Sequence, residues 1–281
     1  NVARIALNRP EVRNAMNALM IKELTEAVDW LDARDDIRVI EICGNGKSFC
    51  AGADINYMKD VASFGYNQNL EDAKRLSKLM IDIGKYNNIE VICVLTNMDI
   101  PLGNNVGNSL EVEEAIEILK ENKKGPLRDL CIELSSYMVS LGLNIDYKSA
   151  KIKVLENIEN GNAYNKFVEI IKTQNGELEK LPKSTNKYDI KTMTEGYLVD
   201  IDAYKLGILS MSLGAGRKNK EDHIDYSAGI VIHKNINDYI NKEDTIMTLY
   251  TNKKITNIDN TIFKISTDRI TNNNLIIDII K

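Results

Sequence analysis

The spacing of hydrophobic positions in the first part of the chain predicts alternating strands and helices. Alternating apolar and polar residues indicate a half-buried strand, whereas apolar residues three or four positions apart indicate one face of a helix. In chain order, these patterns predict a strand over residues 2–7, a helix over 16–31, a strand over 38–43 and a helix around 70–80. The turn-forming run Asn8-Arg9-Pro10 ends the first strand. We therefore expect an α/β arrangement.

Further along, the apolar residues predict a strand followed by several helices. Residues 91–98 (VICVLTNM) are apolar and β-branched, which predicts a buried strand. In the next helix, Asn108 should cap the first turn, with Glu111 three residues on. The apolar face expected for this helix comprises Val112, Ala115, Ile116 and Leu119. Further helices are expected over residues 127–143, 152–158 and 165–171.

From about residue 188 the pattern shortens to strands and turns. Residues 196–200, 229–232 and 245–250 alternate or are rich in β-branched side chains. They predict a small β-rich domain. Paired short strands would also suit a lipoyl or biotin carrier, but no lysine lies in a recognisable carrier hairpin, and we disfavour that alternative.

The composition changes abruptly near residue 80. Residues 1–80 contain 6 Arg, 5 Lys and 10 Ala, whereas residues 81–281 contain 3 Arg, 22 Lys and 6 Ala. Folding does not require such a switch in composition. A joint between two coding sequences of different origin therefore explains it better than compositional drift between domains. One helical stripe nevertheless continues across the joint through Ala73, Leu76, Met80 and Ile83. We predict three regions, over residues 1–80, 81–187 and 188–281.

Charge and cysteine usage exclude several classes of protein. A net charge of −5 and a pI near 5.3, without a basic stripe, argue against a nucleic-acid partner. No apolar run approaches the roughly 18 residues of a membrane helix, so no membrane partner is expected. Cys43, Cys50, Cys93 and Cys131 have neither CxxC spacing nor nearby histidines. This favours reduced thiols in the cytoplasm over zinc or disulfides.

The loop of small residues over 44–55 (GNGKSFCAGADI) is the first candidate for chemistry. Gly46-Lys47-Ser48 suggests a phosphate-binding loop, but that motif requires a glycine where Glu41 stands. Small residues after a strand can instead leave backbone N–H groups free to donate to an oxyanion. An ordinary tight turn is the alternative, and spacing alone favours it. The glycine-rich loop over residues 101–108 poses the same choice between an anion site and a plain connection.

Two motifs in order resemble the opening of the enoyl-CoA hydratase (crotonase) family. They are ALNRPEVRNAMN over residues 6–17 and SFCAGADI over residues 48–55, and the similarity continues through Met58-Lys59 and residues 69–73. Within that family, residues 50–73 most resemble methylglutaconyl-CoA hydratases. The resemblance implies that the amide of Ala53 is one of two that hold the thioester oxygen as it becomes an enolate. The residues that it places beside the adenine of coenzyme A are Ala53, Asp54 and Ile55.

The rest of that family's active site has no counterpart in the sequence. The resemblance calls for a glycine-rich turn with a second oxyanion amide and for acidic residues that move protons, and no such glycine cluster follows Met80. One oxyanion donor without an acid–base partner cannot carry out the hydration. We therefore expect half of a site, for which a coenzyme A thioester would be the substrate.

A second and longer resemblance covers residues 81–281. Residues 91–119 (VICVLTNMDIPLGNNVGNSLEVEEAIEIL) and 213–230 (LGAGRKNKEDHIDYSAGI) resemble pyrimidine-nucleoside phosphorylase and the related thymidine phosphorylases. This implies that phosphate attacks C1′ of a pyrimidine nucleoside between closing α and α/β domains. It also implies half of a potassium site, because hard oxygen donors suit that cation. The matching positions are the backbone oxygens of Leu102 and Asn105 and the carboxylate of Glu114.

The sequence also departs from this second family. Asn105 replaces a small residue, which a backbone ligand tolerates, and Asn237 and Glu243 replace turn glycines. The family's phosphate-cradling loop and its base-recognising Arg, Ser and Lys precede the matched part, and crotonase-like sequence stands in their place. The expected fold is α/β: a partial crotonase-like segment, a partial phosphorylase α/β region and a β-rich C-terminal domain.

The leading functional hypothesis is a pyrimidine-nucleoside phosphorylase-like region fused to a partial acyl-CoA hydratase-like segment, catalytically incomplete by itself. The enzyme alternative is hydration of a coenzyme A thioester, and the third is a non-catalytic or artefactual fusion. The expected partners are small molecules, either a pyrimidine nucleoside with phosphate or an acyl-CoA. A homo-oligomer is also expected.

Overall fold

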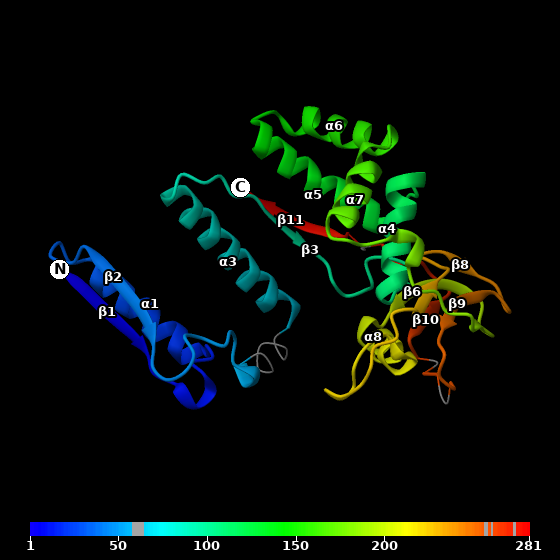
Figure 1. Ribbon diagram of the computed structural model, residues 1–281, viewed down its shortest axis with the longest axis horizontal. Helices are drawn as coiled ribbons and strands as arrows, with labels where there is room; N and C mark the ends of the chain where they lie inside the picture. The colour runs from blue at the N-terminus through cyan, green and yellow to red at the C-terminus, as the bar shows by residue number, and fades with distance from the viewer. Residues whose placement is uncertain (58–64, 256–257, 260, 272–273) are drawn as a thin grey trace. The chain divides into compact units, whose positions relative to one another are not determined.

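The computed structural model describes residues 1–57, 65–255, 258–259, 261–271 and 274–281 (Figure 1). Met58 and Lys59, which extend the first family motif, lie outside the described residues. The chain divides into two compact units, Asn1–Leu79 and Met80–Lys281, and each is treated by itself. Both combine helices with strands, which confirms the expected α/β class.

The first unit is built on a pair of parallel strands joined by a helix. Strand β1 (Val2–Leu7) pairs with β2 (Val39–Gly44), and helix α1 (Ala18–Asp32) connects them. The helix begins two residues later than predicted, because the side chain of Asn17 caps it by accepting the N–H of Met20 at 2.9 Å. The side chain of Asn17 thus fixes where the helix between the two strands begins.

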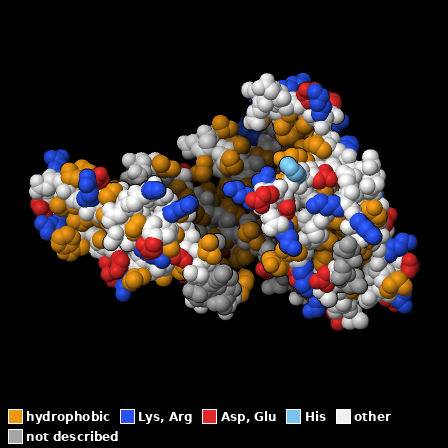
Figure 2. All heavy atoms as spheres, turned by 60° about the horizontal axis from the view of Figure 1, so that its bottom comes forward, with side chains coloured by type: hydrophobic (Ala, Val, Ile, Leu, Met, Phe, Trp, Pro, Cys, Tyr) orange, Lys and Arg blue, Asp and Glu red, His pale blue; other side chains and the backbone are white. Residues whose placement is uncertain are grey.

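Few side chains of the first unit are buried. The apolar residues that reach the interior of this unit include Leu7, Ala15, Met20 and Leu31. Val2, Val39 and Ile42 on the two strands remain exposed, and Figure 2 shows hydrophobic side chains on the visible surface of this unit, at the left of the view. The first unit therefore has a small core for its length.

Helix α3 (Tyr66–Tyr86) runs through the boundary between the units and is longer than predicted. The stripe predicted across it is wrong: Leu76 is 58% exposed and Met80 is 50% exposed. The buried positions are instead Ser77, Ile81 and Gly84. A side chain at Gly84 would overlap the turn that follows the helix, so close packing at that position requires a glycine.

Helices follow one another in the first half of the second unit, and each covers a predicted helix. Their bounds are α4 (Asn108–Glu121), α5 (Pro126–Leu143), α6 (Tyr147–Glu159) and α7 (Asn162–Thr173). Strand β3 (Cys93–Thr96) precedes them and pairs antiparallel with β11 (Ile276–Ile280). This strand was expected to be buried, but it is only half buried, because its sheet has two strands.

The start and the buried face of α4 differ from the prediction. Gly107 and not Asn108 is the capping residue, and the carboxylate of Glu111 accepts its N–H at 3.1 Å. The side chain of Asn108 instead donates to the carbonyl of Ala215 at 3.0 Å. The expected apolar face is only half buried, since a face with a buried carboxylate packs inward in its place. The buried residues of α4 are Ser109, Leu110, Glu114 and Ile118.

Two antiparallel sheets make up most of the remaining chain. One has the order β4 (Asn105–Val106), β7 (Gly229–Ile232), β9 (Thr245–Tyr250), β5 (Lys187–Lys191). The other has the order β10 (Phe263–Ser266), β6 (Gly196–Ile201), β8 (Tyr239–Ile240). Helix α8 (Ala203–Ser210), which the sequence did not predict, packs with both sheets in one core. The fully buried members of that core include Leu198, Leu206, Ile230, Ile240 and Leu249.

Candidate functional site

The loop after β2 is held in place by a buried asparagine that follows β1. Asn14 has 0% exposure, and its Nδ2 donates to the carbonyl oxygens of Asn45 and Ser48 at 2.9 Å each. Its Oδ1 accepts the backbone N–H of Arg9 at 2.8 Å. The residue adopts a φ of 57°, a left-handed conformation that asparagine tolerates better than most residues. Asn14 therefore fixes where the loop leaves β2.

The other end of the loop is held by an ion pair. Arg9 donates from Nη1 to the carbonyl of Ala15 at 2.7 Å and from Nη2 to Oδ2 of Asp54 at 3.0 Å. Oδ1 of Asp54 accepts the N–H of Asn56 at 2.9 Å. These contacts, with the Asn56 amide first and Arg9 next, lower the pKa of Asp54 below its ordinary value. The Asp54 carboxylate is thus an ionised anchor of the turn and not a base for proton transfer.

Ala53 lies between two bonds that Met16 makes with its neighbours. The N–H of Met16 donates to the carbonyl of Gly52 at 2.7 Å, and the N–H of Asp54 donates to the carbonyl of Met16 at 2.8 Å. In such a parallel bridge, the N–H of the central residue points away from the partner. Within the described part of the chain, the Ala53 N–H has no acceptor, and Ala53 is exposed. It is therefore available to a ligand oxygen.

The three positions carried over from the crotonase resemblance occupy one turn but differ in setting. Ala53 presents a free N–H, Asp54 is buried against Arg9, and Ile55 is 71% exposed. The local sequence pattern did not reveal the roles of Arg9 and Asn14, although both lie in the first motif. One signal was present. Asn14 is a polar residue between Arg13 and Ala15, shortly before an apolar helix, and the local pattern gives no reason for its burial.

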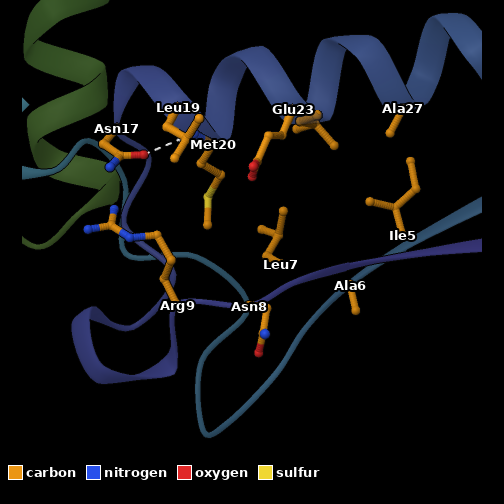
Figure 3. Close-up of a pocket in the computed structure, with 11 residues that line it drawn as sticks. Ile5, Ala6, Leu7, Asn8, Arg9, Asn17, Leu19, Met20, Glu23 and Ala27 are labelled. Atoms are coloured by element: carbon orange, nitrogen blue, oxygen red, sulfur yellow. Dashed lines mark hydrogen bonds between the residues drawn. The ribbon is translucent and has the colours of Figure 1, made fainter.

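A hollow beside this turn lies between β1 and α1 (Figure 3). Its volume is about 450 Å³, and β1 and α1 supply its apolar walls. The residues that line it include Ile5, Leu7, Arg9, Asn17, Leu19, Met20 and Glu23. Figure 3 shows Ile5 and Leu7 facing the helix across it. The turn with Ala53 is not among its walls, so the free amide and the hollow form separate features.

A second candidate site surrounds a buried carboxylate on α4. Glu114 is 5% exposed, its Oε1 accepts the N–H of Asn104 at 2.9 Å, and its Oε2 accepts the N–H of Asn105 at 3.1 Å. A Cβ at Gly103 would overlap this carboxylate, which explains a glycine there. The structure therefore brings the segment from Leu102 to Asn105 onto Glu114, and these are the three positions of the expected potassium half-site.

The carbonyl and carboxylate oxygens at this site are hard ligands, the kind that a cation such as potassium binds. The carbonyl of Asn104 is used by β7, since it accepts the N–H of Ile232 at 2.7 Å. The neighbouring Asn105 directs its backbone N–H to Glu114 and its side-chain amide to the carbonyl of Leu110 at 2.7 Å. Both carboxylate oxygens of Glu114 keep lone pairs beyond the one amide bond that each accepts.

The two phosphorylase-like motifs fold against each other although they are far apart in sequence. Strand β4 of the first motif pairs with β7 of the second. The N–H of Ser109 donates to the carbonyl of Tyr226 at 3.1 Å. Gly107 and Gly229 approach so closely that a Cβ on either would strike the backbone of the opposite motif. The motifs thus form one structural unit at the start of α4.

Among the described residues, no three His, Cys, Asp or Glu side chains converge as a metal site. No helix in the part of the chain that the structure describes has the length and apolar character needed to cross a bilayer.

Comparisons with known proteins match two families to different but overlapping parts of the chain. The sequence model of the enoyl-CoA hydratase/isomerase family matches residues 2–96. That of the pyrimidine nucleoside phosphorylase C-terminal domain matches residues 197–267. A solved enoyl-CoA hydratase from Shewanella pealeana is 35% identical, covers 28% of this chain and 30% of that chain, and has a TM-score of 0.26.

Similar curated proteins are phosphorylases. Pyrimidine-nucleoside phosphorylase of Bacillus subtilis is 35% identical over 227 residues, which cover 78% of this chain and 52% of that protein. Thymidine phosphorylase of Metamycoplasma hominis is 36% identical over 220 residues, which cover 76% of this chain and 74% of that protein. The chain spans about half the length of the pyrimidine-nucleoside phosphorylases that it matches. It belongs to the pyrimidine-nucleoside and thymidine phosphorylase family, and its N-terminal segment is of the enoyl-CoA hydratase/isomerase type.

Proposed function

We propose that the second unit is part of a pentosyltransferase that splits pyrimidine nucleosides with phosphate, and that this chain alone does not complete the reaction. The observation that carries the proposal is the packing of the two phosphorylase-like motifs around α4, where β4 pairs with β7. Residues far apart in sequence, which carry both motifs of the resemblance, meet there. The chain would therefore supply the framework of the phosphorylase without its substrate ligands.

The proposed incompleteness follows from which residues occupy the first part of the chain. By resemblance, the residues that cradle phosphate and recognise the base precede the matched part, which begins at about residue 81, and crotonase-like sequence stands in their place. Losing both sets removes the positioning of the two reactants as well as charge stabilisation, and positioning contributes a large share of catalysis. The proposed partners are a pyrimidine nucleoside and phosphate, and self-association and a cytoplasmic setting stay predictions.

We also propose a role for the carboxylate on α4 in cation binding. Glu114, with the backbone oxygens of Leu102 and Asn105, would hold one side of a potassium ion. Bound there, the ion would stabilise the segment before α4 by neutralising a buried carboxylate. The support is the burial of Glu114 against that segment, together with hard oxygen donors.

A second function is proposed for the first unit, on the observation that the Ala53 N–H is exposed and without an acceptor among the described residues. This amide would donate to the oxygen of a coenzyme A thioester, and Asp54 and Ile55 would border the adenine. Hydration would not follow, because the second oxyanion amide and the acid–base residues that the resemblance calls for have no counterpart in the sequence. The competing proposal is a non-catalytic or artefactual fusion.

Two assays on the purified chain test these proposals. Release of free pyrimidine from uridine or thymidine in the presence of phosphate should not exceed the no-protein control. Turnover would contradict the proposed incompleteness, and its loss in Glu114→Ala would place the active site at α4. Crotonyl-CoA should bind weakly and keep its enoyl absorbance. Ala53→Pro, which removes the N–H, should abolish that binding, whereas Ala51→Pro serves as the matched control.

A further inference from the structure

Two cavities in the second unit share one buried arginine. The larger, termed the helical groove, has a volume of about 350 Å³ among helices α4, α5, α6 and α7. Its walls are mostly apolar and include Ile118, Leu119, Ile132, Val139, Val154 and Ile158. The smaller, termed the polar vestibule, has a volume of about 100 Å³ and is lined by Asn104, Lys123, Lys124 and Asn235, among others. Arg128 lines both cavities.

The guanidinium of Arg128 is buried without a close counter-charge. The residue is 9% exposed, and its Nε donates to the neutral side-chain oxygen of Asn122 at 2.7 Å. Nη1 lies 3.5 Å from a carboxylate oxygen of Asp129, whose side chain is 71% exposed. An exposed partner at that distance neutralises little charge. Buried cations ordinarily need a paired anion, so this setting favours an added one.

One nitrogen of Arg128 is free to meet such an anion. Among the described residues, Nη2 has no acceptor. In the described structure, every buried side-chain nitrogen and oxygen has a hydrogen-bond partner. Because Nη2 has none, it must be accessible to solvent. The open space that Arg128 lines is the helical groove and the polar vestibule. Nη2 is therefore a candidate donor to a ligand in these cavities.

The other charged groups around the two cavities are several lysines and one acid. Lys123 in the vestibule is paired with Glu117 at 2.5 Å, whereas Lys124 has no ion pair among the described residues. Lys153 lies at the groove and is exposed. Glu114 also lines the vestibule, and its carboxylate is held by backbone amides. Its negative charge disfavours a dianion beside Arg128.

We propose that the helical groove binds a small amphipathic carboxylate. The aliphatic chain lies among the apolar walls, and the carboxylate accepts a charge-assisted hydrogen bond from Nη2 of Arg128. Small-molecule sites combine apolar walls with a few polar groups and occupy roughly 300–1,000 Å³, so the groove suits a short chain. This proposal does not rest on the proposed phosphorylase and thioester functions.

Calorimetric titration of the full chain with octanoate tests the site, with n-octanol as the neutral probe of the same length. Octanoate should bind about tenfold more tightly than octanol, as expected for one charge-assisted bond. Arg128→Met keeps the aliphatic stem and should abolish this preference without weakening octanol binding. Arg217→Met, which removes an exposed arginine from a loop outside the groove, should leave both affinities unchanged.

Two further measurements keep the test decisive if Arg128→Met perturbs folding through its bond to Asn122. Val154→Phe fills the groove and should weaken both probes. Cys131 lines the groove and is exposed, so alkylation of its thiol by iodoacetamide reports occupancy of the groove. Octanoate should slow alkylation of Cys131 several-fold and leave that of Cys50, in the other unit, unchanged.

Three outcomes would overturn the proposal. Equal affinity of the unaltered chain for octanoate and octanol would show that the groove binds an aliphatic chain without recognising the carboxylate. Octanoate binding that survives Val154→Phe would place the ligand elsewhere. Protection of Cys131 that grows with protein concentration, without octanoate, would assign the groove to a second copy of the chain.

Discussion

Replacing Asn14 with alanine should destabilise the first unit by about 4 kcal/mol. The substitution leaves the carbonyls of Asn45 and Ser48 without a donor and the N–H of Arg9 without an acceptor, and each lost partner costs about 1 kcal/mol. Alanine tolerates the left-handed conformation at this position, with a φ of 57°, less well than asparagine, and this adds about 1 kcal/mol. At roughly 0.05–0.15 kcal/mol per residue, that loss is comparable with the whole stability of the unit.

The single tryptophan of the chain gives an assay confined to this unit. Trp30 lies on α1, so its fluorescence during urea unfolding follows the first unit alone. Asn14→Gly keeps the left-handed backbone without strain and should cost about 3 kcal/mol. Asn8→Ala removes one exposed side-chain bond, to Asn45, and should cost less than about 0.5 kcal/mol. If Asn14→Ala were as mild as Asn8→Ala, the loop would not be held as we describe.

Three other predictions concern the two units separately. Because the folded-state pKa of Asp54 is lowered, its contribution to stability is complete above the ordinary value of about 3.9 and is lost as pH falls through the folded-state value; Asp54→Asn should flatten that acid limb in Trp fluorescence. Glu114→Ala strands two amide donors and should cost about 2–4 kcal/mol in thermal unfolding, whereas the exposed ion pair of Glu113 makes Glu113→Ala nearly neutral. Limited proteolysis should cut first between Asp54 and Gly84 and leave a fragment with residues 196–281; resistance there, with one cooperative transition, would argue for a single shared core.

Local patterns predicted the strands well where alternation alone sets their limits. Strands β1, β7 and β9 have the bounds that the sequence indicated. Helix α8 was missed because its surroundings read as strand and turn. The faces of α3 and α4 were assigned wrongly, because their buried positions include small residues and a carboxylate beside apolar side chains. Apolar periodicity has no means of marking Ser77, Gly84 or Glu114 as interior.

The candidate sites, too, were predictable from the sequence only in part. The turn around Ala53 was found through its family resemblance, and its free N–H follows from a bridge with Met16 that no local pattern contains. The role of Arg9 depends on Asp54, 45 positions away. The helical groove depends on four helices that meet through tertiary packing, and only the buried Arg128 distinguishes it from an ordinary interhelical gap.

The pairing of β3 with β11 has a consequence for the way the chain is made. Residues 93–96 leave the ribosome long before residues 276–280, yet they form one ladder. Contacts between such distant segments form slowly. During synthesis, β3 therefore waits with an unpaired edge while helices α4 to α7 emerge and pack. The first unit can fold on the ribosome in that interval, whereas this ladder closes only after translation has passed residue 280.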